Sequence, residues 1–178
     1  MLNDKVLFKG EAKADRNIEM NTRMIVEQYK KRNDWINRIR ETKRLQIVGS
    51  SMCPVLDPTN ISTIFLSFCN EYRVGDVVAF EYKQSLMGVS VHRIIKKSRK
   101  NILTKGDNNI QCDEAIDISS IIGKVEMALT NESIVVSIRT SKPIAILSRI
   151  ENSLVKWLPN RVSYSLHKIL TKIYILIS

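Results

Sequence analysis

The sequence predicts a mainly β, antiparallel domain that is preceded by one helix and followed by a helical hairpin. The chain has 178 residues, of which 44% are hydrophobic and only 6% aromatic, so it can bury one aliphatic core. Its middle part holds short β-type runs separated by turn residues, with no helical pattern between them. This arrangement favours an antiparallel sheet over an alternating α/β fold. Helical periodicity is confined to the two flanks.

The N-terminal part, residues 1–44, is predicted to form a polar start and a basic amphipathic helix. Residues 1–17 show no period, so we expect a loop or a frayed end there. From Ile18 to Thr42 apolar residues recur at helical spacing, and neither proline nor glycine interrupts them. The opposite face of this helix is rich in Lys and Arg, which is typical of a solvated face.

Residues 45–140 are predicted to form the β domain. The strongest turn signals in it are Arg73–Asp76 and Lys105–Asn109, where glycine stands beside aspartate. The runs that predict strands are Leu45–Val48, Thr63–Phe68, Asp76–Tyr82, Val89–Lys96, Asn101–Thr104, Ile121–Leu129 and Ser133–Ile138.

The C-terminal part, residues 141–178, is predicted to form a pair of basic helices. Pro143 suits a first helical turn and Pro159 ends the first helix. The pair is expected to pack on the β domain as a hairpin; alternatively, it lies against a membrane surface as a basic amphipathic element. The expected apolar faces are Ile144, Leu147, Ile150, Leu154 and Leu158 in the first helix, and Leu166, Ile169, Leu170, Ile173 and Ile177 in the second.

The net charge of +10 is confined to the flanks. Residues 1–44 carry 12 basic and 7 acidic side chains, residues 45–140 carry 10 of each, and residues 141–178 carry 6 basic and 1 acidic. A neutral domain with basic arms suits an anionic partner, such as a membrane surface, nucleic acid or an acidic peptide.

No stretch reaches the roughly 18 consecutive apolar residues of a membrane span, and the first residues lack the apolar centre of a signal peptide. We therefore expect a cytoplasmic protein, bound at most to the surface of a membrane. The three cysteines, Cys53, Cys69 and Cys112, lack the paired spacing of a zinc site and are expected to be free thiols. Neither a metal nor a cofactor is expected.

Three polar clusters interrupt the β runs, at Gly49–Pro54, Ser90–Ile94 and Thr104–Asp113. A serine hydroxyl becomes a good nucleophile when a base removes its proton, and an imidazole held by a carboxylate supplies such a base near neutral pH. Ser51, His92 and an aspartate of the third cluster would make this set if the fold brings them together. A single histidine on a strand is also compatible with a purely structural role.

Five motifs that contain these clusters occur in an order that resembles the type I signal peptidases. The resemblance covers residues 45–127, and the histidine makes it similar to the endoplasmic-reticulum and archaeal branch. It implies a β domain of the signal-peptidase and LexA type. The motifs are Gly49-Ser50-Ser51-Met52-Cys53-Pro54, Gly75-Asp76-Val77-Val78-Ala79-Phe80, Val91-His92-Arg93-Ile94-Ile95, Leu103-Thr104-Lys105-Gly106-Asp107-Asn108-Asn109 with Asp113, and Ile122-Gly123-Lys124-Val125.

The resemblance also implies roles for individual residues. Ser51 takes the position of the nucleophile, His92 that of the general base and Asp113 that of the third triad member, with Asp107 in a structural or supporting role. The backbone N–H of Ser51 would stabilise the oxyanion. Some relatives add a hydroxyl where this chain has Gly49, so the Ser50 hydroxyl or another backbone N–H is a candidate second donor. Cys53 is expected to be a bystander.

Relatives carry a membrane helix shortly before the serine motif, whereas Gln28–Arg44 is polar and basic here. This difference favours a soluble serine endopeptidase that cleaves a precursor or leader peptide after a small residue. The alternative is a LexA-type self-cleaving regulator that binds DNA, with Ala12-Lys13-Ala14 as its cleavage sequence. Such regulators use lysine as the base, so His92 favours the peptidase, and nucleic acid is not the expected partner. The oligomeric state stays open.

Overall fold

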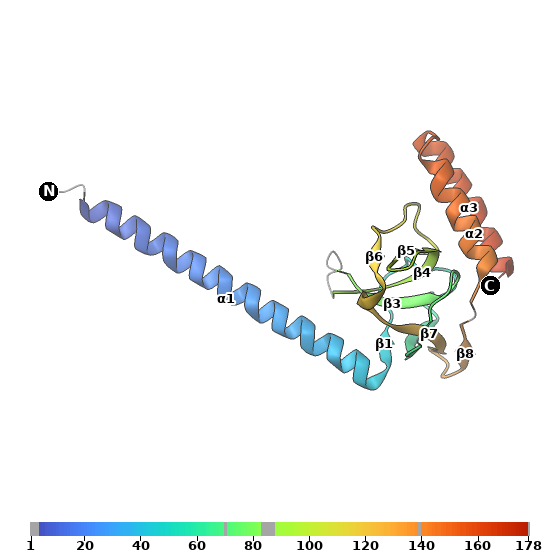
Figure 1. Cartoon of the computed structure of the whole chain (residues 1–178), viewed down its shortest axis with the longest axis horizontal. Helices are drawn as coiled ribbons and strands as arrows, with labels where there is room; N and C mark the ends of the chain where they lie inside the picture. The colour runs from blue at the N-terminus through green and yellow to red at the C-terminus, as the bar shows by residue number, and fades with distance from the viewer. Residues whose placement is uncertain (1–3, 70, 83–87, 139, 178) are drawn as a thin grey trace. The chain divides into compact units, whose positions relative to one another are not determined.

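The computed structural model describes residues 4–69, 71–82, 88–138 and 140–177. Their strands form one antiparallel sheet that curves into a half-barrel (Figure 1). The strands lie in the order β1-β2-β7-β3-β4-β5-β6, and β8 also pairs with β7. The predicted mainly β, antiparallel class is confirmed. The strands are β1 (Arg44–Gln46), β2 (Ile61–Ser67), β3 (Val77–Glu81), β4 (Val89–Lys97), β5 (Asn101–Lys105), β6 (Ile116–Asp117), β7 (Ile121–Thr130) and β8 (Val135–Ser137).

Each of the predicted β runs overlaps one of these strands. The first strand ends at Gln46 rather than Val48, so the chain leaves the sheet before it reaches the serine motif. The sequence did not predict β6 or the 3₁₀ turn Ile118–Ser120 that follows it. Two residues are too few for the alternation that marks a strand in a sequence.

Helix α1 runs from Asp4 to Thr42. The expectation of a loop over residues 1–17 is wrong from residue 4 onward, and residues 1–3 lie outside the described part. Helix formers without proline extend this helix although they show no apolar stripe. The chain divides into two compact units, Met1–Asn37 and Arg38–Ser178. In the described part of the chain, no helix combines the length and hydropathy needed to cross a bilayer.

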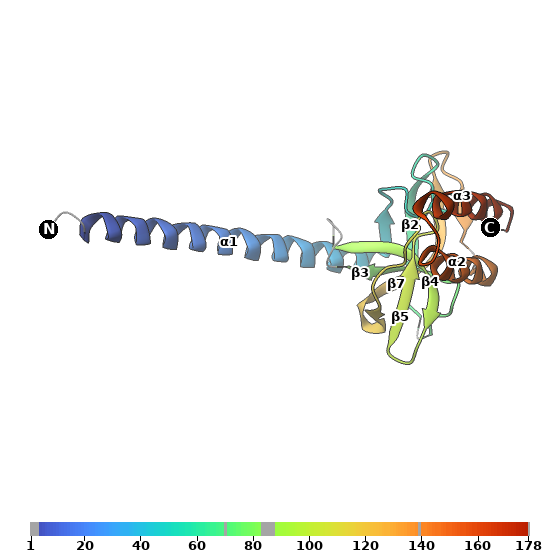
Figure 2. The ribbon, with the colours of Figure 1, turned by 90° about the horizontal axis from the view of Figure 1, so that it is seen from above.

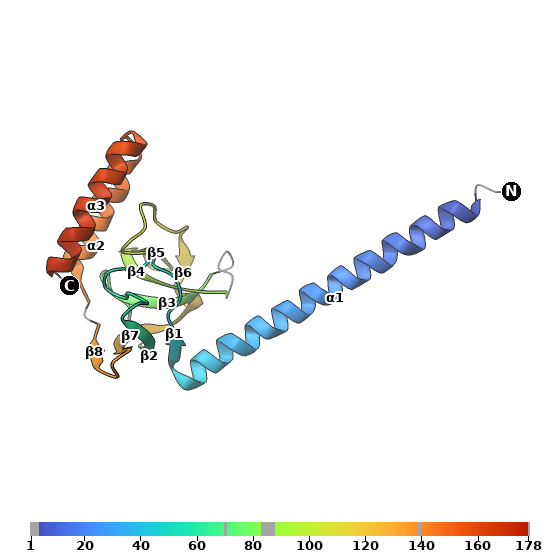
Figure 3. The same ribbon diagram turned by 180° about the vertical axis from the view of Figure 1, so that it is seen from behind.

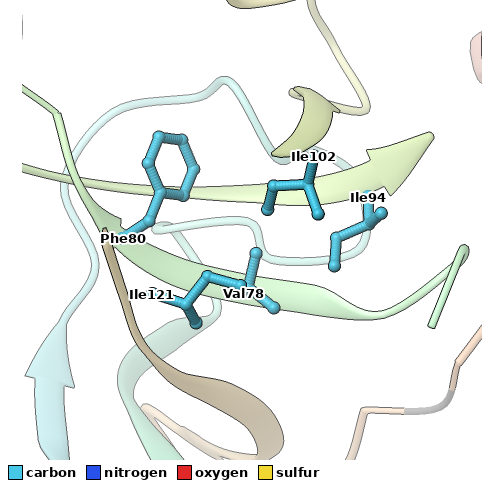
Figure 4. Close-up of a cluster of buried hydrophobic side chains, with 5 residues drawn as sticks. All are labelled: Val78, Phe80, Ile94, Ile102 and Ile121. Atoms are coloured by element: carbon cyan, nitrogen blue, oxygen red, sulfur yellow. The ribbon is translucent and has the colours of Figure 1, made fainter. Parts of the chain in front are cut away.

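A cluster of buried side chains from four neighbouring strands fixes the sheet (Figure 4). It contains Val78 and Phe80 of β3, Ile94 of β4, Ile102 of β5 and Ile121 of β7. Apart from Phe80 the cluster is aliphatic, and its members alternate with residues that face the other side of the sheet. This packing determines the position of β4, the strand that carries His92.

Helices α2 (Lys142–Val155) and α3 (Asn160–Ile177) lie side by side as the predicted hairpin (Figures 1 and 3). Ser141 caps α2 by accepting a hydrogen bond from the backbone N–H of Ile144 at 3.4 Å. Ile144 and Leu170 are buried between the two helices and the domain. The hairpin belongs to the same compact unit as the sheet.

The face that α2 buries differs from the predicted one. Its buried residues include Ser148 and Glu151, whereas the expected core residues Ile150 and Leu154 are exposed. On α3, Ile169 is exposed as well. The apolar stripe did not identify the buried face because Glu151 has buried polar partners, described below, that stabilise it inside the protein.

Candidate active site

Ser51 opens the turn that follows β1. Gly49 has a φ of +88°, a left-handed conformation that favours glycine, and it lets the chain turn sharply before the serine. The turn continues to Leu56, whose N–H donates to the carbonyl of Met52 at 2.9 Å. Met52 and Leu56 are buried and anchor the turn in the domain. The serine is thereby held on a short, fixed segment rather than on a long loop.

The fold brings together the three residues that the sequence predicted as a triad. Nε2 of His92 lies 3.1 Å from Oγ of Ser51. Nδ1 of the same ring lies 2.6 Å from Oδ2 of Asp113. The His92 and Asp113 side chains are only 9% and 10% exposed, so both contacts are largely shielded from water. These residues are far apart in the sequence. His92 and Asp113 meet because β4 pairs with β5, and the segment after β5 also holds the serine turn through the N–H of Asn108.

The geometry assigns a proton position to the imidazole of His92. A carboxylate oxygen only accepts hydrogen bonds, so Nδ1 of His92 donates to Asp113. Nε2 then keeps its lone pair and accepts from the hydroxyl of Ser51. The ring of Phe80 packs edge-on against His92 with the centroids 6.0 Å apart, which limits rotation of the imidazole. The arrangement can transfer the hydroxyl proton of the serine to the ring.

A second hydrogen bond orients the carboxylate of Asp113. The hydroxyl of Thr104 donates to Oδ2 at 2.7 Å, and the N–H of Asp113 donates to the carbonyl of Thr104 at 2.9 Å. Thr104 is fully buried on β5. The two contacts connect the end of the 104–113 segment back to its start, so the carboxylate has one defined direction.

The same segment holds the serine turn from the other side. The N–H of Asn108 donates to the carbonyl of Ser51 at 2.8 Å, and its side-chain amide donates to the carbonyl of Ser50 at 3.1 Å. A Cβ at Gly106 would lie 2.6 Å from the carbonyl oxygen of Ser51, which is closer than real Cβ atoms approach. The close approach therefore requires glycine at this position.

Asp107 is buried and contacts Arg93 rather than His92. Its carboxylate accepts two parallel bonds, from Nε at 2.9 Å and from Nη2 at 2.7 Å. Arg93 also donates to the carbonyl of Gly75 at 2.8 Å. Both side chains are almost completely excluded from water. Because residues alternate along β4, His92 faces the triad while Arg93 connects the neighbouring segments to the strand.

A buried charge network connects the same segment to the helical hairpin. Nζ of Lys105 lies 2.6 Å from Oε2 of Glu151, and Nδ1 of His167 lies 2.7 Å from Oε1. Lys105 and Glu151 are fully buried and His167 is 5% exposed. Both oxygens of Glu151 are thus engaged, one by β5 and one by α3. The Lys105–Glu151 ion pair therefore connects the hairpin to β5, the strand that precedes Asp107 and Asn108.

Ser50, the predicted second oxyanion donor, is exposed, and its contacts to the site run through its backbone carbonyl. Its hydroxyl role stays a prediction, as does that of the Ser51 N–H. Beside them, burial raises the pKa of the Cys53 thiol, and the nearby Asp57 carboxylate raises it further. Cys53 is therefore a protonated, weak nucleophile near neutral pH. Among the described residues, no group of three or more His, Cys, Asp or Glu side chains is arranged to hold a metal ion.

Comparisons with protein-family models, with curated proteins and with solved structures find no match to this chain. The resemblance to signal peptidases therefore stays a prediction from the five motifs. The geometry of Ser51, His92 and Asp113 is an observation of its own, which does not depend on any relative.

Apart from Asp107, sequence reasoning did not single out the residues that support the triad. Thr104, Arg93 and Asn108 lie inside the motifs. The signal that could have identified them is a polar side chain next to buried positions. Glu151 carried a different signal, since it is the single acidic residue of the basic segment 141–178. An isolated acid on an otherwise basic helix pair indicates a specific partner, although the sequence does not say which one.

Proposed function

We propose that this chain is a serine endopeptidase of the signal-peptidase and LexA type, acting on cytoplasmic precursors through a Ser51, His92 and Asp113 triad. The observation that carries the proposal is the continuous chain of contacts from the Ser51 hydroxyl through His92 to Asp113. A buried histidine with only a structural role would not need a serine hydroxyl from a separate turn on its second nitrogen. The edge-on Phe80 and the Thr104 bond to Asp113 also support a ring held for proton transfer.

The chemistry follows from these positions. Oγ of Ser51 attacks a peptide carbonyl carbon while Nε2 of His92 takes the hydroxyl proton, and Asp113 stabilises the resulting imidazolium. The imidazolium then gives its proton to the leaving amine, which leaves an acyl-enzyme on Ser51. A water molecule attacks the acyl carbon and gives its proton to His92. The imidazolium then returns this proton to Oγ of Ser51 as the acyl–oxygen bond breaks, which releases the acid product. The Ser51 N–H is the first candidate donor to the oxyanion.

A peptide substrate is supported by the sheet edge next to the serine. β1 is the terminal strand of the sheet and leads directly into the serine turn. An extended peptide can add to such an edge through backbone hydrogen bonds. Val48 lies between β1 and Ser51 and is 89% exposed, so its apolar side chain is available to a bound peptide. We propose that the substrate is a precursor or leader peptide cut after a small residue.

The test is peptide cleavage by the purified chain, read by mass spectrometry on a mixed peptide library. Wild type should cleave after small residues, and Ser51→Ala should abolish cleavage. Ser153→Ala is the matched control, because it removes an exposed serine hydroxyl of α2 that lies outside the site. Equal cleavage by wild type and Ser51→Ala would refute the proposal.

The alternative of a self-cleaving DNA-binding regulator rests on the basic arms and on the triplet Ala12-Lys13-Ala14. Asp4–Thr42 is one uninterrupted helix, whereas a helix-turn-helix needs a turn between two helices. The triplet Ala12-Lys13-Ala14 lies within this helix and would have to unwind before a nucleophile could reach its peptide bond. Intact mass after incubation, for wild type and Ser51→Ala, separates the two functions.

A further inference from the structure

The outer face of α2 carries an exposed apolar row. Ile146, Ile150 and Leu154 stand four residues apart, so they form one stripe along the helix, with exposed fractions of 52%, 50% and 43%. Trp157, just beyond the helix, is 86% exposed. This stripe lies away from the face that buries Ile144 and Glu151. Large apolar side chains in such a row mark an interaction surface.

The apolar stripe continues from α2 onto α3. Val162 and Ile169 of α3 are 48% and 58% exposed. The half-buried Leu147, Leu166 and Ile173 pack together in the seam between the helices, which makes the apolar surface continuous across the hairpin. Figure 2 shows the two helices next to each other from a second direction.

A basic row accompanies the apolar stripe on each helix. Residues seven apart lie on the same side of a helix, and this spacing relates Lys142, Arg149 and Lys156 on one helix and Arg161 and Lys168 on the other. All five are exposed. Glu151, the single acidic residue of segment 141–178, is buried against Lys105 and His167. The hairpin therefore presents basic and apolar side chains to the outside and no carboxylate side chain.

We propose that this face of the hairpin docks the protein on the surface of an anionic phospholipid bilayer. The helices would lie in the plane of the interface, with the apolar stripe in the acyl boundary and the basic rows on the headgroups. Trp157 fits this position because its ring is apolar and its N–H is polar. A neutral helix groove of a protein partner would not require a basic row on both helices. The proposal goes beyond peptidase activity and does not require it.

Vesicle flotation with the full chain tests the charge requirement. Wild type should float with vesicles of phosphatidylcholine and phosphatidylglycerol but not with pure phosphatidylcholine. Each basic side chain near an anionic surface contributes about fivefold to the partition coefficient, so replacing three should weaken binding about a hundredfold. The test variant is Lys156→Gln with Arg161→Gln and Lys168→Gln. The control with equal loss of charge is Lys96→Gln with Arg99→Gln and Lys100→Gln, in exposed positions of the β4–β5 hairpin.

Fluorescence of Trp157 reports the hairpin directly. In a Trp35→Phe variant, Trp157 is the remaining tryptophan. Its emission should shift to shorter wavelength when anionic vesicles are added, and brominated lipids should quench it. Trp157→Ser with Ile150→Ser should weaken flotation, whereas Ile134→Ser, at a similarly exposed apolar residue in the turn between β7 and β8, should leave it unchanged. Because these side chains are exposed, circular dichroism should be the same for all variants.

Three results would overturn the proposal. Wild type could stay unbound with anionic vesicles, it could float equally well after the hairpin substitutions, or it could float while the emission of Trp157 stays unchanged. A second copy of the chain would be the occupant if Trp157 instead shifted with protein concentration in the absence of lipid. Ser51→Ala should bind vesicles as wild type does, so failure of the peptidase proposal and failure of this one are separate outcomes.

Discussion

Replacing Glu151 by glutamine should destabilise the domain strongly, although the two side chains have nearly the same shape. One oxygen of Glu151 accepts from Lys105 at 2.6 Å and the other from His167 at 2.7 Å. Glutamine keeps one acceptor and turns the other into a donor that faces a donor. It also leaves the ammonium of Lys105 buried without a counter-charge. Breaking one partner out of a buried pair costs about 3–5 kcal/mol.

This loss can be measured by thermal unfolding followed by circular dichroism. For a domain of this size, a loss of about 3–4 kcal/mol lowers Tm by roughly 10 °C. Glu132→Gln is the matched control, because Glu132 is exposed in the turn before β8 and its replacement should change stability by less than about 0.5 kcal/mol. A Glu151→Gln variant that unfolds within 2 °C of wild type would refute the reasoning.

A second variant separates the burial of charge from the packing of the hairpin. In Lys105→Met with Glu151→Leu and His167→Phe, the whole network becomes apolar, and such replacements are often neutral or stabilising. Most of the lost stability should return. If the stability does not return, the loss in Glu151→Gln comes from the missing hydrogen bonds of Glu151 rather than from the unpaired charge of Lys105. Peptide cleavage by the triple variant would show whether the apolar network still positions residues 106–108.

Three further outcomes follow from the site. Asp113→Asn should lower kcat about 10³- to 10⁴-fold with the fold intact, because an amide stabilises the wrong tautomer of His92; an unchanged kcat would remove Asp113 from the triad. Gly106→Ala should lower kcat about 10²-fold, since its Cβ would lie 2.6 Å from the Ser51 carbonyl oxygen and shift the turn; unchanged kinetics would show that the turn can yield. Iodoacetamide should label Cys53 more slowly than free cysteine at pH 7, because its raised pKa keeps the thiol protonated, and labelling should accelerate at higher pH; mass spectrometry of the Cys53 peptide measures both rates.

The sequence predicted those parts of the molecule that local patterns encode. Alternating apolar residues predicted the runs around β2, β3, β4, β5 and β7, and the ordered motifs selected Ser51, His92 and Asp113. The start of α1 was wrong because residues 4–17 extend a helix by propensity without an apolar period. The face of α2 was wrong because a stripe of isoleucines and leucines outweighs one glutamate in any count of hydrophobicity. Burial of that glutamate depends on Lys105, 46 residues away, which no local pattern registers.

Four consecutive residues connect the helical hairpin to the candidate active site. Thr104 holds Asp113, Lys105 holds Glu151, Gly106 lies against the Ser51 carbonyl, and Asp107 holds Arg93. Because side chains alternate along the chain, this short stretch is fixed from both sides at once, by the triad on one and by the hairpin on the other. A displacement of α2 and α3 would therefore reach the triad through Lys105 as well as through β4, the strand against which α2 packs. Cleavage measured with and without anionic vesicles would detect that coupling as a change in kcat that Glu151→Gln removes.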